Sequence, residues 1–255
     1  MIKRIFPLIV LVFFAFSSSA STTWHADWIT MPGEDGHDYG VYYFRKTVEL
    51  GSRPTAFPVY VSADNRYKLF INGTLVSLGP ARNDIYHWNY ETVDLAPWLV
   101  AGKNTVCAIV WNEADHRPEA QLSFHTAFIL QGASPAEEIL NTNKSWKCMR
   151  DSAYRPINDF FFAASSGELV NRNHSVNNWM AAAYDDVRWP FAAQLFGGQP
   201  KGNGDGFGWM LVPSKLPPRE MRYQRIPVCR KADGITVPDG FPAQKARSPY
   251  PRIPR

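Results

Sequence analysis

The sequence predicts an all-β fold, a jelly-roll β-sandwich, and three observations indicate it. The 255 residues include 20 prolines and 17 glycines beside 9 tryptophans, 11 tyrosines and 16 phenylalanines, which is typical of short strands joined by turns. No stretch before Pro218 keeps up the 3.6-residue apolar period of a long amphipathic helix. Short alternating or apolar runs recur instead, at the spacing that is usual in sandwiches.

The clearest elements lie in residues 63–112. Asn72-Gly73 stands between two apolar-rich runs and predicts a β-hairpin, because both central residues of a type I′ turn need a positive φ. Residues 105–111 (TVCAIVW) are continuously apolar, which predicts a strand in the centre of the sandwich. A short turn of helix is expected before that strand, at residues 94–99.

Further strands are expected on both sides of this segment. Residues 42–50 alternate well enough between apolar and polar side chains to form one of them. The others are short runs bordered by turn residues, at residues 59–63, 67–71, 75–78, 91–94, 122–130, 137–140 and 145–149. A glycine-rich loop at 197–208 precedes a predicted last strand at 209–213.

A signal peptide is predicted at residues 1–20. Lys3 and Arg4 precede an apolar stretch at 5–16, and Ser18-Ser19-Ala20 has the small residues of a cleavage site. The protein is therefore expected to be exported, to the periplasm or the medium, with no membrane contact after signal removal. A retained membrane anchor is the alternative.

The sandwich is predicted to span residues 21–212, and a Pro-rich basic linker or tail residues 213–255. The tail holds nine of the chain's 20 prolines, which cannot donate to a β-ladder. It also holds most of the basic surplus, so the predicted sandwich is net negative although the chain's formal charge is +4. A nucleic-acid partner needs a basic face on a folded domain, so none is expected.

The three cysteines predict neither a metal site nor a cofactor. Cys107, Cys148 and Cys229 form no CxxC or Cys/His spacing. Cys107 lies inside an apolar run and is expected to be a small buried hydrophobe. A Cys107–Cys148 disulfide is the alternative that the spacing leaves open.

No catalytic residue is predicted in this chain. Glycoside hydrolysis takes two carboxyl groups across a sugar, and Asp185-Asp186 is the one adjacent acidic pair of interest. Neighbouring side chains on a strand point to opposite faces, and on a loop they cap backbone N–H groups, so a structural role is expected for this pair. No serine lies in a G-x-S-x-G elbow either.

Aromatic and planar polar side chains gather at residues 79–90 and 111–117. Carbohydrate sites combine a flat aromatic face with polar groups that bridge hydroxyls. The candidate carbohydrate-binding residues are Asp64, Asn65, Arg82, Asp84, Trp88 and Asn112. We expect Asp64, Asn65 and Arg66 to lie level with Asn112 if the two central strands are neighbours.

Two alternatives compete with this site. In the first, Trp88, Trp98 and Trp111 simply fill the sandwich, and Arg82 pairs with Asp84 or Glu113. Trp111 itself is expected near the buried strand. In a complete enzyme, the loop at 79–90 would instead lean over a catalytic cleft without binding sugar alone.

The order of elements in residues 63–112 resembles the non-catalytic, galactose-binding-like N-terminal sandwich of bacterial, Bacteroides-like α-L-rhamnosidases. The T-N-x-S-W-K element at 142–147 and the VPxxLPPxE segment at 212–220 are also similar to that family. The resemblance implies a galactose-binding-like topology that is followed by a linker. It also implies a carbohydrate partner, such as a rhamnose-containing plant glycan. Finally, it implies that the chain is truncated before the catalytic (α/α) barrel.

The expected function is therefore that of a non-catalytic carbohydrate-binding or scaffold module of an exported α-L-rhamnosidase-like glycoside hydrolase, and activity is not expected from this chain alone. A free-standing carbohydrate-binding protein is the first alternative. The N-terminal sandwich of a β-galactosidase-type hydrolase, which is similar in outline, is the second.

Overall fold

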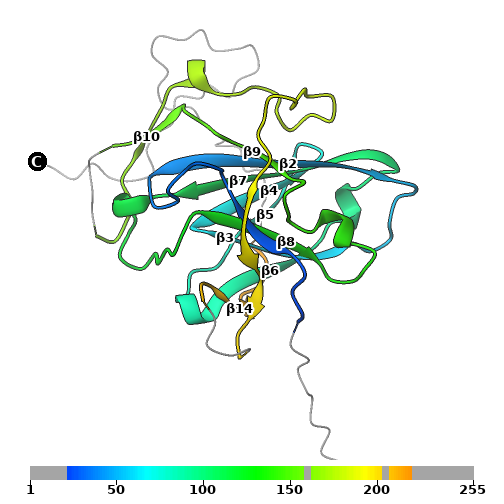
Figure 1. The fold of residues 1–255 in the computed structure, drawn as a ribbon, viewed down its shortest axis with the longest axis horizontal. Coiled ribbons are helices and arrows are strands. Elements are labelled where there is room, and N and C mark those ends of the chain that lie inside the picture. Colours follow the sequence, from blue (N-terminus) through cyan, green and yellow to red (C-terminus); the bar gives the residue numbers. More distant parts are fainter. Residues whose placement is uncertain (1–21, 158–161, 203–206, 220–255) are drawn as a thin grey trace, which may run out of the picture. The chain divides into compact units, whose positions relative to one another are not determined.

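The computed structural model describes residues 22–157, 162–202 and 207–219, in which strands dominate and helical turns are short (Figure 1). The chain divides into two units, residues 1–218 and 219–255. The fold described below is that of the first unit.

Several predictions concern residues outside the described ranges. They are the signal peptide at residues 1–20, Cys229, and the predicted tail from Glu220 onward. The proposed domain boundaries therefore stay predictions.

One layer of the fold is a five-stranded antiparallel sheet. Its strands follow in the order β5 (Thr74–Gly79), β4 (Arg66–Ile71), β7 (Gly102–Asn112), β2 (Gly40–Leu50) and β9 (Lys147–Arg150). β2 and β7 pair along their full length, from Gly40 opposite Asn112 to Leu50 opposite Gly102. This long ladder forms the rigid centre of the sheet.

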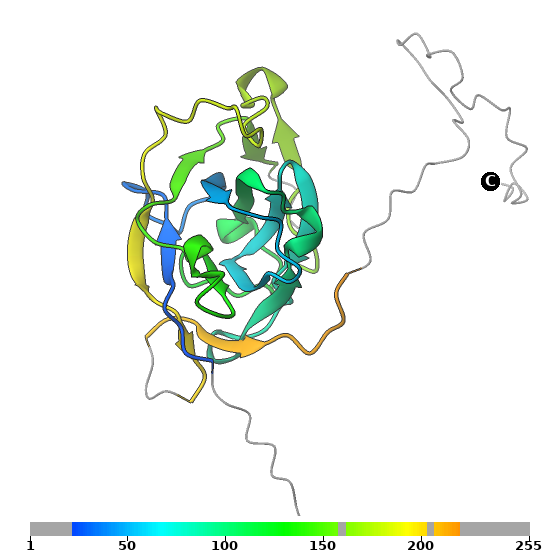
Figure 2. The ribbon, with the colours of Figure 1, turned by 90° about the vertical axis from the view of Figure 1, so that its right-hand side faces the viewer.

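The facing layer has seven strands. Their order is β12 (Ala193–Gly197), β1 (Asp27–Thr30), β8 (Ala127–Gly132), β3 (Pro58–Asp64), β6 (Trp88–Asp94), β14 (Met210–Pro213) and β13 (Gln199–Pro200). β14 runs parallel to β6 and β13, whereas the other pairs are antiparallel. Figure 2 shows β1 and β12, in blue and yellow, side by side at the left edge. The predicted β-sandwich is thus confirmed.

Short elements complete the described part. β10 (Tyr154–Pro156) and β11 (Glu168–Val170) form a separate two-stranded ribbon. The 3-10 turns are η1 (Ile85–His87), η2 (Ala96–Trp98), η3 (Ala114–His116), η4 (Glu138–Leu140) and η5 (Arg172–His174). Within the ranges that the structure describes, no helix has the length and apolar character that crossing a membrane requires.

The hairpin and the central strand agree with the sequence prediction. Asn72 and Gly73 join β4 to β5 with φ values of +51° and +80°. β7 lies between β4 and β2, and its residues Val106, Ala108 and Val110 are fully buried. The helical turn expected at residues 94–99 is η2.

Two of the predicted strands are wrong in part. The strand expected at 122–130 begins only at Ala127, because the amides of Phe124 and Thr126 bond to Asp64 and to the carbonyl of Gly36. The strand expected at 137–140 is η4 instead. Leu140 is fully buried in the main core, whereas Ile139 is exposed.

The main core lies between the two sheets. Phe44, Leu69 and Val110 of the five-stranded sheet face Val61 and Phe128 of the other, and all five are fully buried. Burying an apolar side chain of this size contributes about 1.5–3 kcal/mol. This inner core therefore accounts for much of the stability of the sandwich.

Each sheet is also covered on its outer face by an aromatic cluster. Trp24, Trp28, Trp88, Tyr90 and Trp209 belong to the cluster outside the seven-stranded sheet. A second cluster, outside the five-stranded sheet, consists of Val41, Tyr43, Cys107, Trp179 and Trp189. These outer clusters explain why strands such as β2 and β8 are buried on both faces.

Cys107 and Cys148 are free, buried thiols, so the disulfide alternative is wrong. Cys107 pairs with Arg45 in the β2–β7 register, and Cys148 pairs with Phe44 in the β2–β9 register. Because consecutive residues of a strand point to opposite faces, the two thiols lie on opposite sides of the sheet.

Candidate functional site

Three of the predicted site residues form a buried polar cluster, Asp64, Asn65 and Asn112, at one end of the sandwich. None is more than 1% exposed. The Asn65 amide donates to the carbonyl of Trp111 at 3.1 Å, and the Glu113 amide donates to Asn65 Oδ1 at 2.8 Å. Asn65 lies level with Asn112, next to the neighbouring strand β4, as expected, whereas Asp64 ends a strand of the facing sheet rather than a neighbour of β7.

Asp64 connects the end of β3 to two distant segments. Its Oδ2 accepts the Phe124 amide at 2.6 Å and the Trp209 indole N–H at 3.0 Å, while Oδ1 accepts Asn65 Nδ2 at 2.7 Å. Burial raises the pKa of Asp64, and these donated hydrogen bonds oppose the rise. The carboxylate therefore holds the 124–126 segment and Trp209 in place.

Asn112 plays a similar part after β7. Its Nδ2 donates to Thr126 Oγ1 at 2.8 Å, and its Oδ1 accepts the Ala114 amide at 2.8 Å. Ala114 has a φ of +47°, which an alanine rarely adopts. Asn112 and Asn65 together fix the chain around Glu113, immediately beyond Trp111.

The other three predicted residues lie elsewhere. Trp88 is 2% exposed within the outer aromatic cluster, so it presents no face to a ligand in this structure. Arg82 donates to Gln121 at 3.1 Å rather than pairing with Asp84 or Glu113. Asp84 instead contacts His87 at 3.0 Å. Sugar binding by the six predicted residues stays a prediction. Four of them are buried, which supports a structural role for these four: Asp64, Asn65, Trp88 and Asn112.

Trp111 is placed differently from the prediction. Val110 and Asn112, its neighbours on β7, point inward and are buried, so Trp111 projects from the outer face of the sheet and is half-buried. This correction follows from the twofold alternation of the strand. An aromatic side chain therefore stands on the rigid central ladder with part of its surface accessible.

A groove of about 570 Å³ runs beside Trp111, between β4, β7 and the β10–β11 ribbon. Its volume falls in the range of small-molecule sites. We call it the Trp111 groove, and the polar and aromatic residues that line it are Lys68, Trp111, Glu113, Tyr154, Ser165, Ser166 and Glu168. Val41 and Ile109 add apolar surface.

The charged groups of the Trp111 groove are arranged around the indole. Lys68 Nζ lies 5.8 Å from the Trp111 ring centroid, within the range of a cation–π contact. Glu168 accepts a hydrogen bond from the Tyr39 hydroxyl at 3.3 Å. Burial, followed by the nearby Glu168, raises the pKa of Tyr39, which keeps that hydroxyl protonated as a donor. The groove thus offers an aromatic face, one ammonium and two carboxylates.

The sequence prediction missed Lys68, Glu113, Tyr154 and Glu168. The alternation at residues 67–71 was a usable signal, because it places Lys68 on the outer face, away from buried Tyr67 and Leu69. The β10–β11 ribbon had no such signal, since its residues are exposed and irregular in pattern.

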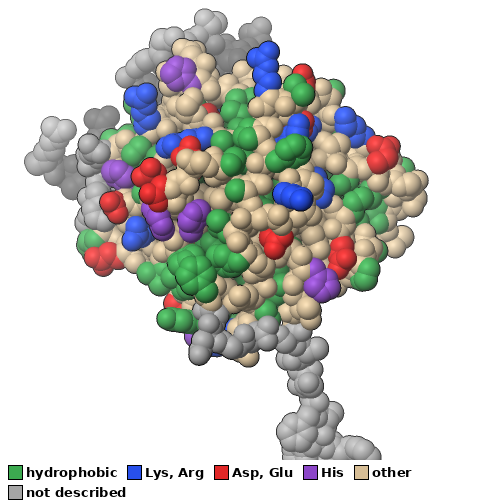
Figure 3. All heavy atoms as spheres, viewed as in Figure 1, with side chains coloured by type: hydrophobic (Ala, Val, Ile, Leu, Met, Phe, Trp, Pro, Cys, Tyr) green, Lys and Arg blue, Asp and Glu red, His purple; other side chains and the backbone are tan. Residues whose placement is uncertain are grey.

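Charges of both signs are interspersed over the face that Figure 3 shows, with histidines and apolar side chains between them. That face differs from the single-sign basic surface of a nucleic-acid-binding domain. In the described part of the chain, no group of three or more His, Cys, Asp or Glu is placed to hold a metal ion.

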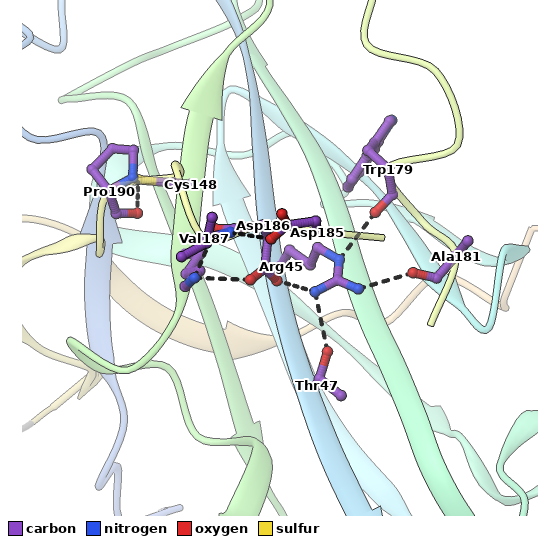
Figure 4. Close-up of polar contacts among 10 residues, drawn as sticks. Arg45, Thr47, Cys148, Trp179, Ala181, Asp185, Asp186, Val187 and Pro190 are labelled. Atoms are coloured by element: carbon purple, nitrogen blue, oxygen red, sulfur yellow. Dashed lines mark hydrogen bonds and ion pairs between the residues drawn. The ribbon is translucent and has the colours of Figure 1, made fainter. Parts of the chain in front are cut away.

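The Asp185-Asp186 pair has the structural role that was expected. Asp185 Oδ1 accepts the Val187 amide at 3.0 Å, which is a local cap. Asp186 is ion-paired with both Arg45 and Lys147 (Figure 4). These carboxylates therefore hold a loop against the sheet.

The comparisons with known proteins find similar solved structures, but no matching family and no matching curated sequence. No family model matches the chain, and no curated protein matches its sequence. Among solved structures, the GH78 family rhamnosidase of Bacillus sp. GL1 superposes with a TM-score of 0.67 and 24% identity, over 76% of this chain and 20% of that one. The α-L-rhamnosidase of Dictyoglumus thermophilum gives a TM-score of 0.55 and 21% identity, over 76% and 23%.

A third neighbour, the native α-L-rhamnosidase of Aspergillus terreus, has a TM-score of 0.53 and 17% identity, over 67% of this chain and 21% of that one. At sequence identities this low, the structural similarity establishes the fold alone. The chain spans about a fifth of the length of each of these three solved chains. The Bacteroides-like origin stays a prediction.

Proposed function

We propose that this chain is a non-catalytic accessory module of an exported α-L-rhamnosidase-like glycoside hydrolase and that it binds carbohydrate in the Trp111 groove. The observation that carries the proposal is the match to the GH78 rhamnosidase, which covers 76% of this chain but only 20% of the larger one. A sandwich that is one part of such an enzyme belongs beside its glycan substrate. A rhamnose-containing plant glycan is the proposed ligand.

The Trp111 groove has the chemistry that a sugar requires. The exposed part of the Trp111 indole packs against the C–H groups of a pyranose ring. Glu113 and Glu168 accept hydrogen bonds from sugar hydroxyl groups, and Lys68 donates one to a hydroxyl oxygen. Rhamnose carries a methyl group in place of a hydroxymethyl group, and Val41 and Ile109 supply apolar surface for it.

The site is also preorganised. Trp111 lies on the ladder that joins β7 to β2 and β4, where it is opposite Val41 and Arg66. Glu113 is fixed through its own amide, which donates to Asn65 Oδ1. Holding these groups before binding lowers the entropy cost of association.

A titration of the ¹⁵N-labelled full chain with L-rhamnose, galactose and glucose tests the proposal. We expect saturable chemical-shift changes around Trp111 and Glu113, with millimolar affinity, about −4 kcal/mol. Rhamnose should bind at least as tightly as the other two sugars.

Trp111→Ala should abolish these changes, and Lys68→Met should weaken them. Trp98→Ala is the matched control, because Trp98 is also partly buried but packs on the inner core. Shifts that persist in Trp111→Ala, or that are absent for every sugar, would contradict carbohydrate binding in the groove.

A further inference from the structure

The last strand that the structure describes, β14, is attached to the end of the sandwich that carries the Trp111 groove. β14 runs parallel to β6, with Leu211 opposite Trp88 (Figure 1). Trp209 directly precedes β14 and is fully buried. Its indole N–H donates to Asp64 Oδ2 at 3.0 Å. Trp209 therefore connects β14 to the end of β3.

The packing around Trp209 fixes the position of its indole. The ring centroid lies 4.0 Å from that of Trp28 and 5.6 Å from that of Phe196. The chain reaches Trp209 through Gly208, which has a φ of +86°, and a Cβ on Gly208 would lie 2.4 Å from Phe196 Cζ. Glycine is the residue that allows such a close approach at a positive φ. The local chain thus directs the indole N–H toward Asp64.

A continuous chain of hydrogen bonds leads from Asp64 to the Trp111 groove. Asn65 Nδ2 donates to Asp64 Oδ1 at 2.7 Å. At the other end of the same planar amide, Asn65 Oδ1 accepts the Glu113 N–H at 2.8 Å. The backbone N–H of Asn65 donates to the Trp111 carbonyl at 3.1 Å. The chain therefore ends on the aromatic residue and on one of the carboxylate residues that line the groove.

The linking side chains are shielded from water. Asp64, Asn65 and Trp209 are each no more than 1% exposed. A buried polar group that loses its partner is unfavourable, because no water replaces the lost hydrogen bond. The Asn65 amide is held at both ends, so a displacement of Asp64 also moves the oxygen that accepts the Glu113 N–H. A change at Trp209 is thus transmitted to the groove.

We propose that this chain of hydrogen bonds couples the Trp111 groove to β14, so that a sugar bound in the groove and the attachment of β14 stabilise each other. The two states of β14 are the attached one, with Trp209 bonded to Asp64, and a locally unfolded one in which that bond is broken. The full chain holds Glu113 in place only in the attached state, so a sugar at Glu113 binds that state more tightly.

The coupling is reciprocal. A sugar should favour the attachment of β14 by the same factor by which detachment of β14 weakens sugar binding. The proposal rests on the proposed function for its ligand. The connection between Trp209 and Glu113 is a property of the fold, and it can be measured without a sugar.

Trp209→Phe tests the connection in the sugar-free protein. It removes the indole N–H and keeps an aromatic ring, so the Glu113 amide should shift in a ¹⁵N spectrum and exchange its hydrogen roughly fivefold faster. Trp146→Phe is the matched control, because Trp146 is also fully buried and its indole donates to the Asn141 carbonyl at 3.2 Å, outside this chain. An unchanged Glu113 amide in Trp209→Phe, or an equal change in both variants, would overturn the proposal.

Asn65→Ala breaks the same chain from the groove side and replaces the test if Trp209→Phe does not fold. The amides at β14 should then exchange roughly fivefold faster. The Ser214 amide, which donates to the Tyr90 carbonyl at 2.9 Å, is the clearest reporter of this attachment. Unchanged exchange there would contradict the coupling.

The second arm adds saturating L-rhamnose to the full wild-type chain. Exchange of the Leu211 and Ser214 amides should become slower, and Trp209→Phe should bind L-rhamnose more weakly by the same factor. Trp111→Ala at the same sugar concentration should show no slowing. Binding of L-rhamnose by the wild type with unchanged exchange at β14 would overturn the coupling. If the wild type binds no sugar, the proposed function fails, and the Glu113 amide in Trp209→Phe still decides whether β14 and the groove are coupled.

Discussion

Single buried polar side chains hold the end of the sandwich together. Asp64 accepts donors from the 124–126 segment and from Trp209, which are remote in sequence. Asn112 and Asn65 do the same for the chain that follows β7. These residues have the chemistry of a ligand site, but their burial makes them positioning residues for Glu113 and the Trp111 groove.

Substitution of two tryptophans distinguishes a role in stability from a role in binding. Trp88 is buried against Trp209, with ring centroids 6.3 Å apart, whereas Trp111 is half-buried beside a groove. Trp88→Ala should cost about 3–5 kcal/mol of unfolding free energy because it leaves a cavity in an aromatic cluster. Trp111→Ala should cost only about 1 kcal/mol. Denaturant unfolding of both variants measures this, and the reverse order would contradict the assigned positions.

The buried thiols should be unreactive in the folded state. Burial raises the pKa of Cys107 and of Cys148 to about 12 in each case, so both remain protonated at pH 8, and the thiolate is the reactive form. In a Cys229→Ala background, iodoacetamide should label neither cysteine until denaturant is added, as mass spectrometry would show. Rapid labelling of either cysteine in the native protein would mean that the face of the sheet on which that cysteine lies opens readily.

At the scale of elements, the 179–186 loop is attached to β2 by specific contacts. Tyr43 stacks on Trp179 with ring centroids 4.2 Å apart and an interplanar angle of 7°. Arg45 adds hydrogen bonds to two carbonyls of the same loop and an ion pair to Asp186. The loop therefore covers the outer face of the sheet and shields Cys107.

Removing Arg45 tests this attachment. Arg45→Met should lower the unfolding free energy by roughly 3–5 kcal/mol, because it leaves two loop carbonyls without their donor and removes one of the two cations paired with Asp186. Arg150→Met is the matched control, since Arg150 is 41% exposed and pairs with Glu34 at the surface. That substitution should cost no more than about 1 kcal/mol. Similar losses for the two variants would show that the Arg45 contacts do not anchor the loop.

Short sequence patterns correctly predicted the elements whose structure depends mainly on neighbouring residues. The Asn72-Gly73 hairpin and the apolar strand at 105–111 could be read directly, because turn geometry and burial leave a signature in neighbouring residues. The sequence could not show which of the outward-facing aromatic residues are covered by other segments of the chain. Trp88 and Trp111 both lie on strands, and they differ because other segments cover one and leave the other partly open.

The candidate site was also predictable only in part, because its burial depends on contacts between segments that are far apart in the sequence. Asp64, Asn65 and Asn112 were expected together and lie at the same end of the sandwich. The neighbouring strands β4 and β7 align Asn65 with Asn112, whereas Asp64 ends β3 of the facing sheet. Their burial depends on the packing of residues 123–126 and Trp209, which are far away in the sequence. Tyr154 and Glu168 come from a ribbon whose position no short pattern determines.

At the scale of the whole molecule, the residues after Pro218 should be dispensable for folding. They contain few apolar side chains and many prolines, so they bury too little surface to offset the entropy of ordering them. A Ser21–Pro218 protein should melt within a few degrees of Ser21–Arg255, as calorimetry would measure. A large drop in melting temperature would show that the tail docks on the sandwich.

The chain should not hydrolyse an aryl α-L-rhamnoside. Cleavage needs an acid and a base on opposite sides of the glycosidic bond, and Asp185 and Asp186 are engaged in structural contacts. Glu113 and Glu168 are the carboxylates that line the Trp111 groove and are the pair to examine. Release of the aryl group that survives removal of host glycosidases and disappears in Glu113→Gln would contradict a non-catalytic role.

The most direct test of carbohydrate binding is a crystal structure of the full chain soaked with a rhamnosyl oligosaccharide. The account predicts a sugar ring packed on Trp111, with hydroxyl groups at Glu113, Glu168 and Lys68 and the rhamnose methyl toward Ile109. Density for the sugar beside Asp84 and Arg82 instead, with the Trp111 groove empty, would contradict it.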